Sequence, residues 1–229
     1  MARRKLTNAD IKGIGMTSQR TRNRLMERLR EKGIANEDVL QIMSKVPRHL
    51  FMDEALSSRS YEDTALPIGH GQTISQPYIV ARMTELLLAS PHPLERVLEV
   101  GTGSGYQAAV LGPLVKKLYT VERIEALYLH TRELLHDLGY RNITTKLSDG
   151  SWGLEREAPF DGIVVTAAPE TIPEALPEQL AIGARLIIPT GAQKQQQELR
   201  VLTRISETEY NTEVMESVQF VPLISDSNH

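Results

Sequence analysis

The sequence predicts one α/β domain built on a doubly wound, mostly parallel sheet, with an antiparallel edge at its C-terminal end and helices at its N-terminal end. Short apolar runs alternate with helical patterns from residue 96 to residue 189. A glycine-rich turn, VGTGSG, joins the first of these runs to a helix. The 229 residues contain no linker or repeat that would divide them. Together these features favour a single parallel sheet covered by helices on both faces.

The N-terminal third predicts an extension followed by packing helices. Residues 1–16 are basic and show no apolar period, so we expect a flexible extension there and one domain over 17–229. Apolar residues at helical spacing predict helices over 18–32 and 36–46, ended by Gly33 and Pro47. Residues 61–76 have no period and predict a long functional loop. Ser75 precedes a helical pattern over 76–89, where its side chain is a suitable N-cap.

The alternating region supplies the sheet. We expect strands over 96–100, 118–122, 143–147, 162–166 and 185–189, with helices over 105–112, 124–138 and about 173–182. Two further strand-like runs, 199–205 and 214–221, are joined by a polar turn around residues 207–211. This arrangement is typical of an antiparallel hairpin, which we place at the edge of the sheet.

Composition limits the functional classes. The chain has no cysteine, which excludes disulfides, thiolate metal sites and cysteine nucleophiles and suits a reducing compartment. No apolar run approaches the length of a membrane span, and no apolar segment follows the basic N-terminus as in a secretory signal. The histidines lack metal-ligand spacing, so we expect no metal. The working prediction is a cytoplasmic protein without a membrane partner. We also expect no nucleic-acid partner, because the basic N-terminal segment has no interleaved aromatic residues on which bases could stack.

The glycine-rich turn carries the strongest chemical signal. Gly101, Gly103 and Gly105 follow a predicted strand and open a helix, where glycines let a ligand approach the backbone. Glu122 ends the next strand, at the spacing of an acidic residue that accepts hydrogen bonds from ribose hydroxyls. Tyr106 occupies the place where a dinucleotide motif has its third glycine. Glu99 adds negative charge beside the turn, which favours a cationic nucleoside ligand over NAD.

Four segments resemble known enzymes. EVGTGSG together with Glu122 resembles the class I S-adenosylmethionine-dependent methyltransferases. ALPIGHGQTISQPYIVARMTELL, FDGIVVTAAPETIPEAL and VQFVPL resemble the protein-L-isoaspartate O-methyltransferase family more narrowly. The resemblance implies a Rossmann-like methyltransferase fold and methyl transfer from S-adenosylmethionine, with S-adenosylhomocysteine as product. The acceptor that it implies is the α-carboxyl of L-isoaspartyl residues in damaged proteins and peptides, whose ester starts repair through a succinimide.

The same resemblance implies the site residues. It places the cofactor beside the glycine turn, the end of the second strand and the Asp-Gly pair after the third strand; adding Glu99 for its charge, the expected contacts are Glu99, Gly101, Thr102, Gly103, Gly105, Glu122, Asp149 and Gly150. It makes Ser75 and Thr73 the catalytic residues, although Ser75 is equally suited to capping a helix. The expected substrate contacts are Ile74, His70, Val221, Pro222 and Leu223.

Three other functions stay open at this level. The first is a class I methyltransferase for a small molecule or a nucleic acid, although VVTAAP stands where amino-methylating nucleic-acid enzymes carry an Asn/Asp-Pro-Pro-aromatic motif. The second is a nicotinamide-dependent oxidoreductase, which Tyr106 and Glu99 disfavour. The third is a cofactor-binding protein without catalysis.

Overall fold

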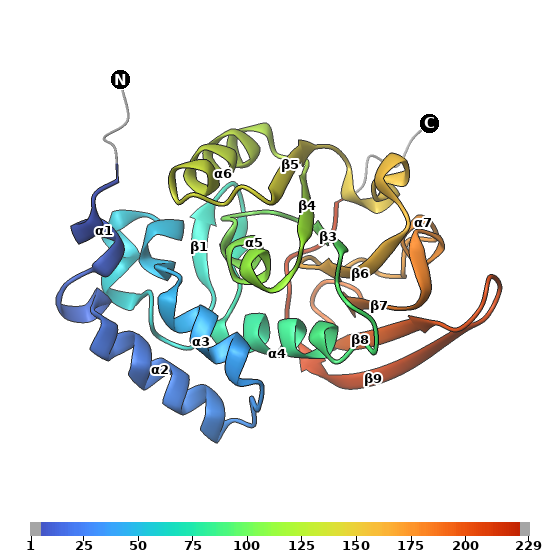
Figure 1. Ribbon diagram of the computed structural model, residues 1–229, viewed down its shortest axis with the longest axis horizontal. Coiled ribbons are helices and arrows are strands. Elements are labelled where there is room, and N and C mark those ends of the chain that lie inside the picture. The colour runs from blue at the N-terminus through green and yellow to red at the C-terminus, as the bar shows by residue number, and fades with distance from the viewer. Residues whose placement is uncertain (1–5, 225–229) are drawn as a thin grey trace.

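A seven-stranded sheet forms the centre of the molecule (Figure 1). The structure, a computed structural model, describes residues 6–224. The strand order is β5-β4-β3-β6-β7-β8-β9, parallel from β5 to β7 and antiparallel at β8 and β9. The strands are β3 (Arg96–Val100), β4 (Lys117–Glu122), β5 (Ile143–Leu147), β6 (Phe160–Val165), β7 (Leu180–Thr190), β8 (Gln197–Arg204) and β9 (Tyr210–Val218). The predicted fold class is confirmed, including the antiparallel edge.

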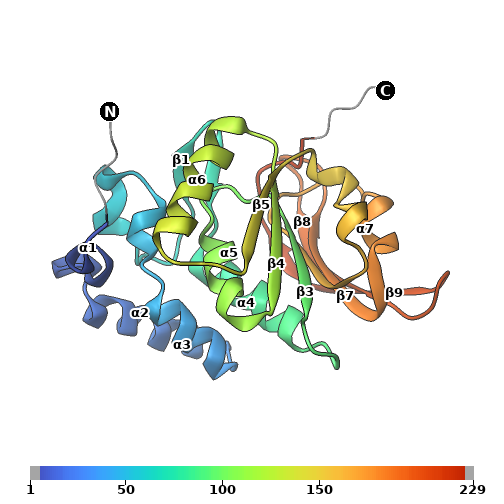
Figure 2. The same ribbon diagram turned by 45° about the horizontal axis from the view of Figure 1, so that its top comes forward.

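Helices and their connections bury both faces of the sheet. Along β3 the side chains alternate, so that Val97 enters one apolar core while Leu98 and Val100 enter the other. The larger core collects the N-terminal helices, α4, α5 and α6, and the smaller core contains Leu176 of α7. Figure 2 shows the N-terminal helices at one end of the molecule and β8 and β9 at the other. The helices are α1 (Asn8–Lys12), α2 (Gln19–Glu31), α3 (Glu37–Lys45), α4 (Pro77–Leu88), α5 (Tyr106–Leu111), α6 (Glu125–Asp137) and α7 (Ala175–Glu178).

The N-terminal segment makes more contacts than its sequence suggested. Residues 1–5 of the expected extension lie outside the described residues. Within the rest, Thr7 and Asp10 form a capping box that starts α1. The buried Arg22 guanidinium on α2 donates to the backbone carbonyls of Ile11 and Lys12. The extension is therefore hydrogen-bonded to the domain, and its flexibility stays a prediction.

Two sequence predictions are wrong in extent. The loop expected over 61–76 contains a small antiparallel sheet of β1 (Leu66–Gly69) and β2 (Gln72–Ile74). The helix expected over 173–182 is reduced to the four residues of α7, because the chain enters the sheet at Leu180, opposite Phe160. β7 is accordingly longer than predicted and includes an irregular register between its first and later pairs with β6.

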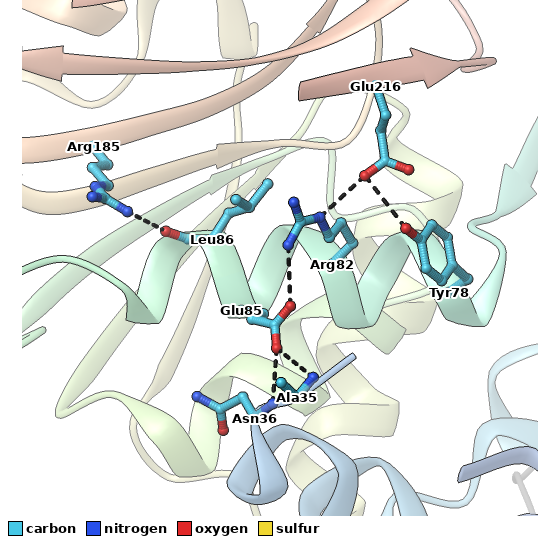
Figure 3. A network of polar contacts seen from close by, with 8 residues as sticks. All are labelled: Ala35, Asn36, Tyr78, Arg82, Glu85, Leu86, Arg185 and Glu216. Atoms are coloured by element: carbon cyan, nitrogen blue, oxygen red, sulfur yellow. Dashed lines mark hydrogen bonds and ion pairs between the residues drawn. The ribbon is translucent and has the colours of Figure 1, made fainter. Parts of the chain in front are cut away.

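A polar network ties α4 to its neighbours (Figure 3). Glu85 on α4 accepts hydrogen bonds from the backbone N–H groups of Ala35 and Asn36, both at 2.8 Å, just before α3. Arg82 on the same helix contacts Glu85 and, at 3.1 Å, Glu216 on β9. The first residues of α3 and the edge strand β9 are therefore both fixed relative to α4.

In residues 6–224, no helix is both long and apolar enough to cross a membrane. Over the same range, no cluster of three or more His, Asp or Glu side chains has the arrangement of a metal site.

Candidate active site

A cleft opens at the carboxyl ends of β3, β4 and β6. In a doubly wound sheet the strand order reverses at this place, and ligands bind there. Loops after these three strands and after β5 form its floor, while β2 and the chain after β9 form its walls. The cleft brings together eleven of the predicted site residues: Thr73, Ile74, Ser75, Gly101, Thr102, Gly103, Glu122, Gly150, Val221, Pro222 and Leu223.

The glycine turn lines the cleft with backbone. Gly101 has a φ of 93°, and a Cβ atom there would lie 2.6 Å from the Thr166 hydroxyl. That hydroxyl donates to the Gly101 carbonyl, so it holds the turn against β6. Gly105 has a different role, because a Cβ atom there would lie 2.4 Å from Thr131 on α6. Gly105 thus allows close packing of the turn against α6, and it does not appear among the residues that line the cleft.

Glu122 lies buried at the end of β4 with its carboxylate in the cleft. One carboxylate oxygen accepts the Gly103 backbone N–H at 2.8 Å, and the other accepts the Ile124 N–H at 2.9 Å. A carboxylate offers about four acceptor positions, so each oxygen retains capacity for a ligand hydroxyl. The two backbone contacts fix the carboxylate and tie the glycine turn to β4.

Glu99 lies beneath the turn and does not line the cleft. Its Oε2 atom accepts the Thr120 hydroxyl at 2.6 Å, and Thr120 in turn contacts the Thr102 hydroxyl at 2.6 Å. Because Thr120 gives its single proton to Glu99, Thr102 is the donor in the second bond. Burial raises the pKa of the Glu99 carboxyl to about 8, and the negative charge of Glu122 acts in the same direction. Glu99 therefore supports Thr102 and the turn from below, and does not supply the negative charge facing the cleft that we expected.

The Asp-Gly pair after β5 is split between two roles. Gly150 lines the cleft at the start of the short 3-10 helix η5 (Gly150–Trp152). The Asp149 carboxylate caps that helix by accepting the backbone N–H and hydroxyl of Ser151 at 2.9 and 2.8 Å. Asp149 itself is not one of the described residues that line the cleft. Its observed role is to hold Gly150 in place.

Ser75 does not cap α4. The N-cap residue is Gln76, and no side chain of that residue closes the helix end. The backbone N–H of Tyr78 instead donates to Asp63, which comes from the preceding loop. Among the described residues the Ser75 hydroxyl has no hydrogen-bond partner, and like Thr73 it lines the cleft. Both hydroxyls are therefore available to a ligand.

The opposite wall is the chain after β9. Val221 accepts the Ala168 backbone N–H at 2.8 Å, and the Leu223 N–H donates to the Ala168 carbonyl at 2.9 Å. These bonds form a parallel bridge between Ala168 and Pro222, next to Thr166 and Ala167 at the end of β6. An extended chain alternates its backbone groups, so the Pro222 carbonyl points away from Ala168.

The cleft also contains residues that the sequence did not single out for it. Thr166 and Tyr106 line it, and the Tyr106 ring lies 4.6 Å from the guanidinium of the buried Arg48. His70, expected at the substrate, lies exposed at the tip of the β1–β2 hairpin with a φ of 53° and is not part of the cleft lining. Its contact with a substrate stays a prediction.

Comparison with known proteins decides the family. The family model for protein-L-isoaspartate(D-aspartate) O-methyltransferase matches residues 19–228. The chain belongs to this family. A curated relative from Cellvibrio japonicus, named protein-L-isoaspartate O-methyltransferase, is 54% identical over 96% of this chain and 98% of its own length. A relative with the same name from Pseudomonas aeruginosa is 54% identical over 92% of this chain and 98% of its own.

Solved structures of family members have the same fold. A putative protein-L-isoaspartate O-methyltransferase from Plasmodium falciparum, in complex with S-adenosyl-L-homocysteine, has a TM-score of 0.76 and 28% identity. The match covers 89% of this chain and 98% of that one. A second protein-L-isoaspartate O-methyltransferase has a TM-score of 0.81 and 26% identity over 90% of this chain and 66% of its own. The expected family is confirmed.

Proposed function

We propose that this protein transfers a methyl group from S-adenosylmethionine to the α-carboxyl group of L-isoaspartyl residues in damaged proteins and peptides. One observation carries the proposal: a single cleft joins the glycine turn and Glu122 to the hydroxyls of Thr73 and Ser75. Family membership and the names of relatives across nearly the whole chain support it. The bound S-adenosylhomocysteine of the Plasmodium falciparum relative supports the same cofactor.

The residues at the floor of the cleft suit S-adenosylmethionine. The absence of a side chain at Gly101 and Gly103 leaves room for a ligand against the backbone, and Glu122 retains acceptor capacity for ribose hydroxyls. Gly150, held by Asp149, would contact the adenine side. When bound, the cofactor supplies an electrophilic methyl group on a sulfonium. Thr102 would contribute through the turn that it stabilises with Thr120.

The substrate side requires positioning and no general base. A carboxylate is already ionised near pH 7, at about three pH units above its ordinary pKa. In our proposal Ser75 and Thr73 donate hydrogen bonds that orient this carboxylate, while Ile74 and residues 221–223 bind the peptide around it. Holding the reacting groups in line supplies the rate enhancement. Methanol leaves an ester more readily than water leaves a carboxylic acid, so the backbone amide nitrogen of the following residue attacks the ester carbonyl, expels methanol and closes a succinimide. Water then opens the succinimide, partly to normal aspartate.

The cellular location and the requirement for a metal or a nucleic-acid partner are also matters of proposal. We propose that the protein acts in the cytoplasm and that it uses neither a metal nor a nucleic-acid partner. Cell fractionation would test the first statement. Full activity after exhaustive dialysis against a chelator would support the absence of a required metal, and activity that returns only with added metal would oppose it.

Binding and transfer together test the function. Calorimetry should detect S-adenosylhomocysteine binding and no NAD binding, which separates this proposal from an oxidoreductase. Labelled methyl groups should then pass to a peptide with isoaspartate at one position and not to the matched aspartyl peptide. Binding without transfer to either peptide would favour another methyl acceptor or a protein without catalysis.

A further inference from the structure

The chain that forms the cleft wall, residues 221–224, comes from the edge of the sheet and reaches the end of β6. Its chain leaves the edge strand β9 at Val218, which pairs with Gln197 on β8. Three residues later it forms hydrogen bonds to Ala168 beside the end of β6. Strand β7 separates β6 from β8 in the sheet, so the connection must turn sharply away from the edge.

The side chain of Gln197 lies at this turn. Its Oε1 atom accepts the Phe220 backbone N–H at 2.6 Å, and its Nε2 atom donates to the Phe220 carbonyl at 3.3 Å. The amide group thus gives Phe220 the donor and acceptor that a neighbouring strand would supply. Gln197 is 2% exposed. A buried amide without hydrogen-bond partners would lower the free energy of unfolding, so these two bonds matter to the fold.

The chain before the turn is held separately. A register shift opposite Leu199 and Arg200 adds Met215 to β9 as a bulge, and bulges redirect neighbouring side chains. Glu216, the next residue, accepts hydrogen bonds from Arg82 and Tyr78 on α4 (Figure 3). These contacts hold β9 without the side-chain amide of Gln197, which forms its hydrogen bonds with Phe220.

We propose that Gln197 is a positioning residue for substrate binding: its amide turns the chain at Phe220 and so places Val221, Pro222 and Leu223 along the cleft. Gln197 does not line the cleft itself, and it acts through the backbone of these residues. The proposal rests on the proposed function, because residues 221–223 are there assigned to the peptide substrate. In the proposed function S-adenosylmethionine binds at the floor, to the loops after β3, β4 and β5, and the side-chain hydrogen bonds of Gln197 go to Phe220 instead.

Two variants separate this role from general stability. Gln197→Met keeps the length of the side chain and removes both hydrogen bonds. The neighbouring Gln196 is exposed and donates to the Ser217 hydroxyl on β9 at 2.8 Å, so Gln196→Met removes a bond to β9 without affecting Phe220. We expect Gln197→Met to raise the KM for an isoaspartyl peptide roughly tenfold, as expected for one or two lost hydrogen bonds. Its kcat and its affinity for S-adenosylhomocysteine should stay within about twofold, and Gln196→Met should change none of these quantities appreciably.

Amide exchange gives a readout that does not depend on activity. The Phe220 N–H of the unchanged protein should exchange with deuterium far more slowly than an exposed amide, and Gln197→Met should accelerate it selectively. A folded Gln197→Met protein with unchanged peptide KM would overturn the proposal. So would fast exchange of the Phe220 N–H in the unchanged protein, which decides the matter even if the variant does not fold. If the unchanged protein methylated no isoaspartyl peptide, the proposed function would fail, whereas the exchange result would still report on the contact between Gln197 and Phe220.

Discussion

The carboxylate of Asp63 accepts the backbone N–H of Tyr78 at 2.8 Å, in the first turn of α4. A residue from the preceding loop thus satisfies a helix donor that the sequence suggested for Ser75. Asp63 also forms an ion pair with Lys32, the residue directly after α2. Because Asp63 caps α4, the Ser75 hydroxyl is left facing the cleft. The chemical role of Ser75 can therefore be tested separately from the stability of the helix.

Ser75→Ala should therefore lose activity and not stability. A hydrogen bond to a charged group contributes about 1.5–3 kcal/mol, so kcat/KM for an isoaspartyl peptide should fall about tenfold or more. The free energy of unfolding in urea should stay within about 0.5 kcal/mol of the unchanged protein. A folded variant with full activity would show that Ser75 does not position the substrate.

Asp63→Ala should have the effect on stability that Ser75→Ala lacks. Loss of a helix cap costs about 0.5–2 kcal/mol, so the free energy of unfolding should fall by that amount. Urea unfolding of the two variants side by side measures the contrast. Equal stability losses in both would contradict the assignment of the cap to Asp63.

Glu122→Ala should weaken S-adenosylhomocysteine binding by about 1–3 kcal/mol, because it removes charge-assisted hydrogen bonds to the ligand and the two backbone contacts that shape the site. Titration calorimetry measures the change. Glu125→Ala is a suitable control, since Glu125 is exposed in the first turn of α6 and does not line the cleft. Equal affinity in both folded variants would argue against the ribose assignment.

The raised pKa of Glu99 predicts a dependence of stability on pH. The carboxyl titrates at about 8 in the folded protein and near its ordinary value, about 4.3, in the unfolded chain. Between these values the folded state retains a proton that the unfolded state has lost, so the free energy of unfolding decreases as pH rises through this range. The contribution is fully present below about pH 4.3 and is lost above about pH 8.

Glu99→Gln removes this titration. The stability of the unchanged protein relative to Glu99→Gln should therefore fall between pH 5 and pH 8.5, by about 1.4 kcal/mol for each pH unit up to about pH 8. Urea unfolding at both pH values measures it, and the exposed Glu178→Gln serves as control. A stability difference that stays constant with pH would mean that Glu99 is ionised in the fold.

Deletion of residues 1–16 should destabilise the domain. Arg22 is 2% exposed and would lose the carbonyl acceptors of Ile11 and Lys12, and hydrogen bonds to charged groups contribute about 1.5–3 kcal/mol. Peptide methylation at low temperature should persist, because no described residue of this segment lines the cleft. Thermal unfolding compares the deletion with Arg20→Ala, whose side chain is exposed. An unchanged melting temperature would show that these contacts contribute nothing.

The parallel part of the fold was predictable because each strand is a short apolar run between helical patterns. Strands β3 and β5 have the predicted bounds. The β1–β2 hairpin was missed because it is short and contains Pro67 and three consecutive residues with positive φ from Gly69 to Gly71. The N-terminal contacts were missed because they join the Arg22 side chain to backbone carbonyls, which leave no apolar pattern.

The site was predictable where it follows a motif and not where it depends on packing. Glycine spacing and Glu122 located the floor of the cleft. The close approach of Thr166 to Gly101 and the burial of Glu99 arise from the pairing of β3 with β6 and β4, which spacing along the chain does not reveal. Gln197 lies 23 residues before Phe220, and nothing near it in the sequence distinguishes it from the glutamines beside it.

The central claim is methyl transfer to one carboxyl group, and the product tests it most directly. An isoaspartyl peptide and its aspartyl counterpart are incubated with the protein and S-adenosylmethionine, and the products are identified by mass spectrometry with fragmentation. The account predicts one added methyl group on the α-carboxyl of isoaspartate, followed by succinimide and partial conversion to aspartate, with no methylation of the aspartyl peptide. Equal methylation of both peptides, or of neither, would contradict it.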